Sequence, residues 1–452
     1  MTVDTADVAE APPAPARPVT VARSYRFELV KLLSQWRVRV LLLACLIGPA
    51  GFVAVVSQQS SLPSDTTFGR WMSATGWAGP LVILGFSGLY VLPLLTSLIA
   101  GDVFAVEDRL GTWRHLLVAV RSYERIFAAK TFASLTVIVL LVAGLTGSGI
   151  VGGLASVGGH PLVGLDGHLL SSGDAAGKVL LAWACALAPT LALGGIGLLG
   201  SVALGRSPMG LLSPVLVALA MDLAQMLPLP IAVRLALPSY GYIAWIGLFT
   251  DPVQSGPLVI SIVVSLGWAV VAVALAYFLF MRRDFTNLSN DGGGRKALLA
   301  GALPIVVLFL VTFGVVTYAV RPTGPSIDQD KIQRSVATVF GHLYRLQAGQ
   351  LHGHDVPESV LGAAAACTKG DGHVAQNGPG NDWRCGIVWH IPGIVAPGSA
   401  VYQLDVSVDG RYEADGDGPK DVNGYFVVHT STGDEPNPLW QFDGNVDLLD
   451  SH

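Results

Sequence analysis

Charged residues are scarce in this sequence. Asp, Glu, Lys and Arg make up 13% of its 452 residues, about half of the share in soluble globular proteins. Hydrophobic residues make up 52%. This composition does not suit an ordinary soluble protein, and it favours a chain embedded in a lipid membrane without a nucleic-acid partner.

The sequence also lacks a phosphate-binding loop. ATP hydrolysis needs G-x-x-x-x-G-K-[ST], whose glycines let backbone N–H groups surround the phosphates. The nearest match, Gly173 to Val179, is one residue short and ends in valine. His352 and His354 stand without clear further ligands, which is typical of solvated side chains rather than of a metal site. We therefore expect no catalytic residue, no metal site and no enzyme activity of the chain's own.

Long uncharged stretches are what the sequence has in abundance. Crossing about 30 Å of hydrocarbon takes roughly 20 apolar residues in a helix, which satisfies its own backbone hydrogen bonds. Charge-free stretches of this kind occur at 40–58, 79–101, 131–156, 179–204, 208–228, 257–281 and 297–320. The sequence thus predicts an all-α polytopic membrane bundle with seven spans.

The distribution of Lys and Arg predicts the orientation of these spans. With the N-terminus in the cytoplasm, 16 basic residues fall in cytoplasmic segments, and only Arg70, Lys178 and Arg234 fall in outer loops. An imbalance of this size over short loops fixes orientation. We expect residues 1–20 to be a disordered cytoplasmic leader rather than a cleaved signal peptide. Residues 321–452 are then expected outside the plasma membrane.

Residues 321–452 differ from the rest of the chain, with 8 Lys and Arg against 17 Asp and Glu. Apolar spacing from Ile332 to Leu346 predicts an amphipathic helix. Strands are predicted at 384–391, 401–408, 411–414 and 425–430, with Asp409-Gly410 as a hairpin turn. The result is a small α+β domain whose role the sequence does not specify.

The chain has four cysteines, and two of them lie in this acidic domain. Cys367 and Cys385 are close in sequence and suited to a disulfide in an oxidising space. Cys45 and Cys185 lie inside predicted spans, where we expect them to be inert packing residues.

A motif follows the second apolar stretch. Residues 101–117 read GDVFAVEDRLGTWRHLL, and a basic segment continues to Ala129-Lys130. This order resembles the permease family of type-2 ABC exporters, in which a span ends in G-D-x-x-A-x-E and G-T-x-R-x-L-L follows. The resemblance covers residues 20–285 and implies six core spans. The linker and seventh span at 286–320 and the domain at 321–452 depart from the family pattern.

The resemblance implies that residues 110–120 form a coupling helix, which sits in a groove of a separate ATPase subunit and transmits its closure to the spans. The residues assigned to this role are Glu107, Gly111, Thr112, Trp113, Arg114 and Leu117. On a helix, Leu110, Trp113, Leu117 and Val120 would share one face suited to a groove. Amphipathicity alone favours an interfacial helix resting on lipid, and the motif favours the coupling helix.

Residues 21–39 form a second amphipathic segment, with Tyr25, Leu29 and Trp36 at helical spacing. By resemblance this is an elbow helix that braces the ATPase contact. The alternative is a helix that only lies on the membrane surface.

Two features belong to the outer side. Residues 228–252 are apolar, broken by prolines and rich in aromatics, which suits short re-entrant helices or an ordinary aromatic belt. Asp222 is a carboxylate within an otherwise uncharged span, with Gln225 one turn later. Intramembrane acids are costly, so both residues are candidates for a translocation path. Asp222 could instead pair with Arg234 or be reached by water.

The leading hypothesis is the permease subunit of an ATP-driven exporter. It would work as a homodimer or heterodimer, with ATP and Mg held by the partner ATPase subunit, on a small-molecule, drug or lipid-like substrate. An ion-coupled secondary transporter is the alternative, although it calls for buried acids or inverted repeats. A membrane-anchored sensor acting through the C-terminal domain is a third.

Overall fold

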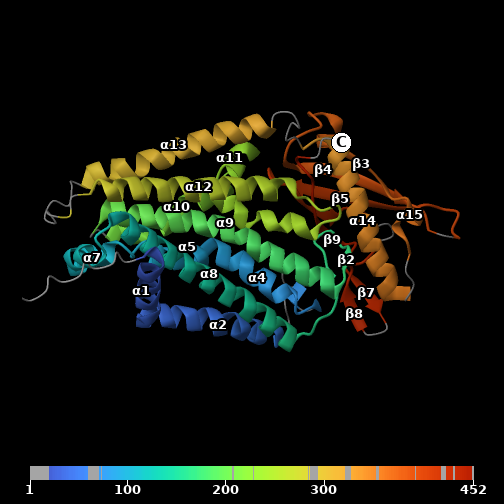
Figure 1. Ribbon diagram of the computed structural model, residues 1–452. Coiled ribbons are helices and arrows are strands. Elements are labelled where there is room, and N and C mark those ends of the chain that lie inside the picture. The colour runs from blue at the N-terminus through green and yellow to red at the C-terminus, as the bar shows by residue number, and fades with distance from the viewer. Residues whose placement is uncertain are drawn as a thin grey trace, which may run out of the picture.

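The computed structural model describes residues 20–59, 71–72, 74–205, 208–227, 229–283, 285, 294–320, 327–352, 356–391, 393–418, 424–430 and 433–449. The predicted leader, apart from Thr20, lies outside these residues, as do Pro228, most of the linker after residue 285, and His354. Within the described ranges the chain forms a bundle of long helices with a β-sheet region at its C-terminal end (Figure 1).

Each of the seven apolar stretches is helical. The helices are α2 (Trp36–Ser57), α4 (Ala78–Phe86) continuing through the π-turn η1 (Ser87–Val91) into α5 (Leu92–Ala100), α8 (Tyr123–Ser156), α9 (Ser172–Leu204), α10 (Pro208–Met226), α12 (Gly256–Met281) and α13 (Gly294–Val320). Among the described residues, five are long and apolar enough to cross a membrane, namely α2, α4 to α5, α8, α9 and α12. The apolar parts of the other two, Gly210–Met226 and Ala302–Tyr318, are shorter.

Helix α9 lies at the centre of the bundle. In its most apolar stretch of 18 residues, 72% of the residues are buried. Small residues allow its neighbours to approach closely. A Cβ at Gly200 would lie 2.1 Å from the Ser213 hydroxyl of α10, and a Cβ at Gly195 would press on Ala269 and Ala272 of α12. Glycine at these positions brings helices into direct contact, as is common in lipid.

The amphipathic segment predicted at residues 21–39 is helical but breaks before its end. Helix α1 (Val21–Ser34) ends at Ser34, Gln35 adopts an extended conformation, and α2 begins at Trp36. Figure 1 shows α1 crossing the end of the bundle at a steep angle to the long helices. The end of the bundle that carries α1, α6 (Ala105–Leu110) and α7 (Trp113–Val120) is called the elbow end.

The proline-broken segment between α10 and α12 forms the short helices α11 (Ile231–Leu235), η2 (Pro238–Tyr242) and η3 (Ala244–Phe249). The side chains of Tyr242 and Trp245 are buried in the bundle. This arrangement matches the predicted short helices and places aromatic side chains in the core rather than in a surface belt.

The C-terminal domain has a helix packed on an antiparallel sheet, as predicted. Helix α14 (Gln329–His352) and the short α15 (Glu358–Leu361) precede the strands. The sheet has the order β3 (Ala364–Lys369), β4 (Gly380–Trp389), β5 (Gly398–Val406), β6 (Arg411–Gly416) and β9 (Gln441–Asn445), while β7 (Val427–Thr430) and β8 (Gly433–Pro436) form a separate hairpin. Asp409-Gly410 lies in the turn between β5 and β6.

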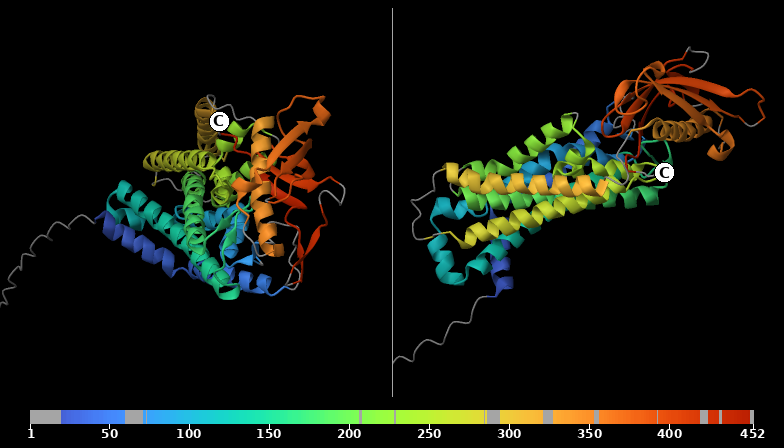
Figure 2. Two further views of the ribbon diagram at one scale, coloured as in Figure 1. Left: turned by 90° about the vertical axis from the view of Figure 1, so that its right-hand side faces the viewer. Right: turned by 90° about the horizontal axis from the view of Figure 1, so that it is seen from above.

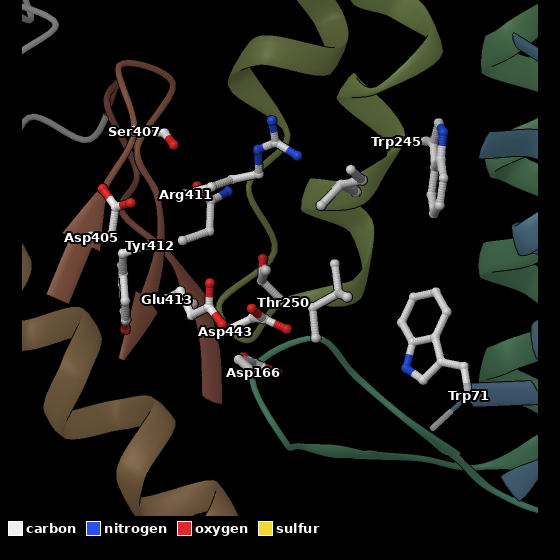
Figure 3. Close-up of a pocket in the computed structure, with 14 residues that line it drawn as sticks. Trp71, Asp166, Trp245, Thr250, Asp405, Ser407, Arg411, Tyr412, Glu413 and Asp443 are labelled. Atoms are coloured by element: carbon white, nitrogen blue, oxygen red, sulfur yellow. The ribbon is translucent and has the colours of Figure 1, made fainter. Parts of the chain in front are cut away.

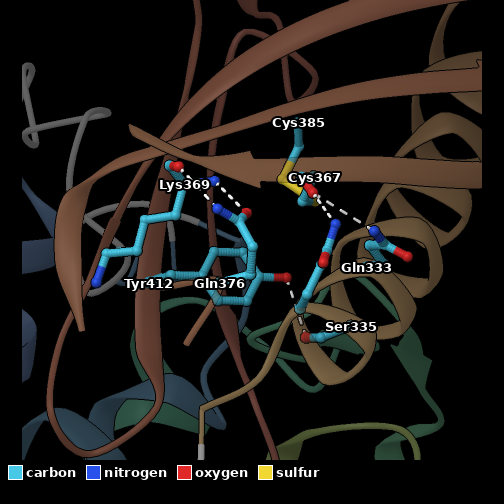
Figure 4. The surroundings of a disulfide bond; sticks show 8 residues. Gln333, Ser335, Cys367, Lys369, Gln376, Cys385 and Tyr412 are labelled. Carbon is cyan, nitrogen blue, oxygen red and sulfur yellow. Dashed lines mark hydrogen bonds between the residues drawn. A yellow bond between two sulfur atoms is a disulfide. The ribbon is translucent and has the colours of Figure 1, made fainter. Parts of the chain in front are cut away.

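The predicted disulfide is present. Cys367 and Cys385 face each other in register on β3 and β4, and both are buried (Figure 4). Gln329 and Gln333 of α14 donate to the Cys367 carbonyl, at 2.7 and 3.5 Å. The bridge closes a short loop and adds about 3 kcal/mol by restricting the unfolded chain. The remaining cysteines, Cys45 and Cys185, are free and buried, as expected.

The C-terminal domain lies against one end of the bundle, called here the tail end, opposite the elbow end (Figures 1 and 2). Arg234 contacts Asp409 across this junction at 3.4 Å, and the Asn445 amide donates to Gln254 at 2.6 Å. His342 of α14 reaches Asp166 in the loop between β1 (Leu162–Val163) and β2 (Leu169–Leu170).

Candidate functional site

The segment resembling the coupling motif lies at the elbow end as two short helices, α6 and α7, joined by Gly111 and Thr112. Gly111 ends α6 in the left-handed conformation, with φ 66°. A side chain there would strain the backbone, so glycine allows the sharp change of direction. The motif glycine therefore has a structural reason that the spacing alone does not reveal.

Three acidic residues of this segment, Asp102, Glu107 and Asp108, are almost completely buried. Burying a carboxylate is unfavourable unless it is paired. Each of the three is paired with a basic residue from a different part of the bundle.

Glu107 occupies the centre of this arrangement. Its carboxylate accepts a hydrogen bond from Lys130 of α8 at 2.7 Å and is also contacted by Lys31 of α1 and by the Thr112 hydroxyl. Lys130 in turn donates to Glu28 of α1 at 3.1 Å. We call Glu28, Lys31, Glu107, Thr112 and Lys130 the elbow cluster.

The elbow cluster holds Glu107 ionised. Burial raises the pKa of the Glu107 carboxyl, but the charge and hydrogen bond of Lys130, with hydrogen bonds from Lys31 and Thr112, outweigh it and hold the pKa at about 2. Glu107 is thus negatively charged throughout the physiological range and ties α6 to both α1 and α8.

The other two acids tie the segment to α2 and to the end of α12. Asp102 pairs with Arg37 at 2.6 Å and also with Arg109. Asp108 accepts from Arg283 at 2.7 Å and from the Trp113 indole N–H at 2.6 Å. Through these contacts α6 and α7 are linked to four helices, α1, α2, α8 and α12.

Trp113 anchors α7 in the bundle. Its ring is fully buried within an aromatic group, with centroids 5.5 Å from Phe280, 5.1 Å from Phe285 and 6.3 Å from Phe104. The prediction that Leu110 shares a face with Trp113, Leu117 and Val120 is wrong, whereas the other three do lie on one face of α7, which is turned toward the bundle. Trp113 faces inward, Leu117 and Val120 are half-buried, and Leu110 is 68% exposed because it belongs to α6, before the Gly111 turn.

The exposed face of α7 is formed by other residues. Arg114 and His115 are exposed, and Val118 is 69% exposed. This face is short, mixed in character and available to a neighbour, whereas the opposite face is fixed in the bundle.

The three residues predicted for the elbow helix, Tyr25, Leu29 and Trp36, have different surroundings. Tyr25 donates to or accepts from the Thr136 hydroxyl of α8 at 3.0 Å, and Leu29 packs against the core. Trp36 belongs to α2 rather than to the elbow helix and is 77% exposed. The break at Gln35 takes Trp36 off the face that Tyr25 and Leu29 share.

Asp222 and Gln225 lie on α10 near the tail end and are both half-buried. The suggested pairing of Asp222 with Arg234 is wrong, because Arg234 donates instead to Gln225 at 3.0 Å and to Asp409 at 3.4 Å. Gln225 therefore helps to fix the junction with the C-terminal domain.

A second charged group lies at the tail end. His342 directs its Nδ1 to the Asp166 backbone carbonyl at 3.1 Å and its Nε2 to Glu358 at 3.1 Å, and Arg345 also contacts Glu358. Asp166 is further bonded to His168. Burial lowers the pKa of His342, but Asp166 and Glu358 outweigh it and raise the pKa above its usual value. The pKa of Asp166 is held well below its usual range, since bonds from His168 and His342 outweigh its burial.

These shifts predict that the folded protein loses stability as the pH rises above neutrality. A His with a raised pKa stabilises the fold fully below about pH 6.5, and this is lost as the pH passes its folded pKa. The pKa of Asp166 is lowered, so the stability that its carboxylate contributes is lost only in strong acid, where the carboxylate becomes protonated. We expect Tm to fall as the pH rises from about 6.5 through the raised pKa of His342, and His342→Gln to flatten that slope. His390→Gln, which changes an exposed histidine, is the control and should keep the wild-type dependence of Tm on pH. Equal slopes in both variants would contradict the assignment.

Several of these residues were not singled out by the sequence. Lys31, Arg37 and Arg283 had counted only toward orientation, Lys130 had counted toward orientation and as the end of the motif, and the acids had no assigned partner. The signal that could have found them is the presence of Asp102, Glu107 and Asp108 within a segment that is otherwise basic. Among the residues that the structure describes, no group of three or more His, Cys, Asp or Glu side chains could hold a metal ion.

Comparison with known proteins adds no assignment: no protein-family model matches this chain, and no curated protein matches it.

Proposed function

We propose that this chain is the membrane-spanning permease subunit of an ATP-driven exporter, energised by a separate ATPase subunit that holds ATP and Mg. The observation that carries the proposal is the construction of the elbow end. The short helix α7, with its exposed outer face, is joined to Asp108 of α6 through the Trp113 indole. The acids before and within α6 form ion pairs with residues of α1, α2 and α8 and with Arg283, just after α12.

This construction suits the transmission of force. A partner pressing on the exposed face of α7 would act on Trp113 and on the buried acids behind it, and therefore on α1, α2, α8 and α12 together. An interfacial helix that only rests on lipid needs no such connections, because burial of its apolar face alone would hold it in place.

The proposal includes seven spans, with α10 and α13 crossing the membrane in addition to the five longer helices. It places the elbow end in the cytoplasm and the C-terminal domain outside. The Lys and Arg distribution supports this orientation. The disulfide supports it as well, since such bonds persist in oxidising compartments. A homodimer or heterodimer of permeases with two ATPase subunits completes the exporter.

The test uses the exposed face of α7. Val118→Asp and Arg114→Glu should abolish co-purification of an ATP-binding subunit from the native membrane, because they place charge on the docking surface without touching the core. Val395→Asp is the matched control, since Val395 is 99% exposed in the C-terminal domain. All three variants should keep the wild-type Tm.

An ATPase that still co-purifies with both α7 variants would refute the assigned docking face. Substrate uptake driven by a proton gradient, with no ATPase bound to the wild type, would favour a secondary transporter. Labelling of an introduced cysteine at position 118 from outside intact cells would overturn the orientation.

A further inference from the structure

Two cavities lie at the tail end, between the C-terminal domain and the loops of the bundle. Figure 3 shows the larger one, which has a volume of about 380 Å³. The smaller one, of about 250 Å³, lies along α14, and Asp166 and Thr250, which Figure 3 labels, line both cavities. Sites for drug-sized ligands begin at about 300 Å³, so the smaller cavity suits a smaller ligand. We call it the α14 cavity.

One wall of the α14 cavity is a face of α14 itself. This wall is formed by Lys331, Arg334, Ser335, Thr338 and Val339. Residues three and four apart lie on the same side of a helix, so these five side chains share one face. Loops of the bundle form the opposite wall. Lys331 thus reaches the cavity from the first turn of α14.

Lys331 is buried without a partner for its charge. It is 9% exposed, and its backbone N–H donates to the Asp328 carboxylate at 2.9 Å. Across the ranges that the structure describes, however, its ammonium takes part in no ion pair or hydrogen bond. Arg334 differs, because it is exposed and interacts within the chain. Burying an unpaired ammonium group is costly. The Lys331 ammonium is therefore the feature of this cavity that points to an anionic group on a ligand.

Acidic side chains lie on other parts of the lining. Asp251 belongs to the loop between η3 and α12, and Asp447 follows β9. Neither carboxylate forms an ion pair within the described part of the chain, whereas Asp166 is already paired with His168 and His342. A ligand with only negative charge would be repelled by Asp251 and Asp447. A ligand that also carries a positive group is attracted at both places.

The uncharged part of the lining is mostly polar. It includes Thr250, Gln254, Ser335 and Asn445, and none of the described lining residues is aromatic. The Asn445 amide donates to Gln254 at 2.6 Å, and the Ser335 hydroxyl donates to the Asn445 carbonyl at 2.9 Å. These bonds hold the bundle loop, α14 and β9 together around the cavity, so its walls are fixed relative to one another.

We propose that the α14 cavity binds a small polar zwitterion, of the size of an amino acid or a dipeptide. Its carboxylate lies against Lys331, and its ammonium group lies toward Asp251 and Asp447. Hydrogen bonds between charged groups of this kind are the stronger ones in proteins. A cation alone would leave Lys331 unpaired, and an anion alone would face the two acids. Binding here needs no ATPase, so this proposal stands or falls separately from the proposed function.

The test measures binding of glycylglycine to the purified full-length protein in lipid nanodiscs by calorimetry. Two matched compounds each lack one charge, since glycylglycinamide has no carboxylate and N-acetylglycylglycine has no ammonium group. We expect each to bind at least about tenfold more weakly than glycylglycine. Equal binding of the three compounds, or no binding of glycylglycine, would overturn the proposal. So would displacement of glycylglycine by inorganic phosphate at equal concentration, which would identify a simple anion site instead.

Lys331→Met tests the site of the carboxylate. It should weaken glycylglycine binding at least about tenfold. It should not lower Tm, because an apolar side chain of similar length replaces an unpaired buried charge. Arg384→Met removes an exposed cation of β4 and is the matched control, which should bind glycylglycine as the wild type does. Unchanged binding in Lys331→Met, or a lowered Tm, would contradict the role given to Lys331.

Asp251→Asn combined with Asp447→Asn tests the site of the ammonium group. Asparagine keeps the side-chain oxygen of residue 447, which accepts from the Leu449 N–H at 2.9 Å. The double variant should bind glycylglycine more weakly than the wild type, because the attraction is lost. It should bind N-acetylglycylglycine more tightly, because the repulsion is lost. A shift of both compounds in the same direction would contradict the assigned orientation of the ligand.

Discussion

Lys130→Met is expected to destabilise the protein by about 3–5 kcal/mol, since it leaves the buried Glu28 without its cation and leaves Glu107 with Lys31 alone. The Lys130 ammonium lies 2.7 Å from Glu107 and 3.1 Å from Glu28, and all three side chains are buried. Methionine matches the length of the lysine stem, so the loss comes from charge and not from a cavity. The thermal midpoint of the purified protein should fall on the order of 5–10 °C.

A rescue experiment separates charge from packing. Adding Glu28→Gln to Lys130→Met removes the carboxylate that lost its cation, while Glu107 keeps Lys31, and should restore at least half of the lost Tm. Arg23→Met, on the exposed face of α1, is the matched control and should leave Tm unchanged. A Tm for Lys130→Met within about 1 °C of the wild type would show that the elbow cluster contributes little to stability.

The elbow cluster illustrates what local sequence patterns cannot supply. The number of basic residues in the short loops predicts orientation, but that count says nothing about pairing. Lys130 and Glu28 are 102 residues apart, and they meet only because α1 packs along α8. The cost of burying Glu107 is likewise invisible until its neighbours are known.

Residues 110–120 show where periodicity gives the wrong face. A helical wheel over residues 110–120 assumes one continuous helix, whereas the left-handed Gly111 separates α6 from α7. Leu110 thus belongs to the previous helix and points elsewhere. Size also misleads, since Trp113 is the largest apolar side chain of α7 and is buried in this chain's own aromatic group rather than in a partner.

The apolar stretches and the hairpin at Asp409-Gly410 could be predicted from the sequence because their sequence patterns are local. Two strands of the five-stranded sheet were missed for the opposite reason. Strand β3 consists mainly of small residues without alternation, and β9 is short and contains Gly444. Both are positioned by their neighbours β4 and β6, and only tertiary structure reveals them.

Trp113→Ala is expected to release α7 from the bundle while leaving most of the fold intact. Removing a buried tryptophan costs about 3–5 kcal/mol, and here the loss includes the ring contacts with Phe280 and Phe285 and the hydrogen bond to Asp108. Since the other inward side chains of α7, Leu116, Leu117 and Val120, are only half-buried, the loss should appear as local opening. Trypsin should then cleave after Arg114 or Arg121 at least about tenfold faster than in the wild type.

Two comparisons make this prediction specific to the anchor. Cleavage after the exposed Arg384 of β4 serves as the internal reference and should not change in Trp113→Ala. Val118→Asp alters the outer face of α7 and should leave cleavage at Arg114 at the wild-type rate, although it abolishes the proposed docking. Uniform acceleration at all three arginines would mean that Trp113 supports the whole fold. Under the proposed function, Trp113→Ala must also uncouple the ATPase, because a lever that is no longer fixed to the bundle cannot move it.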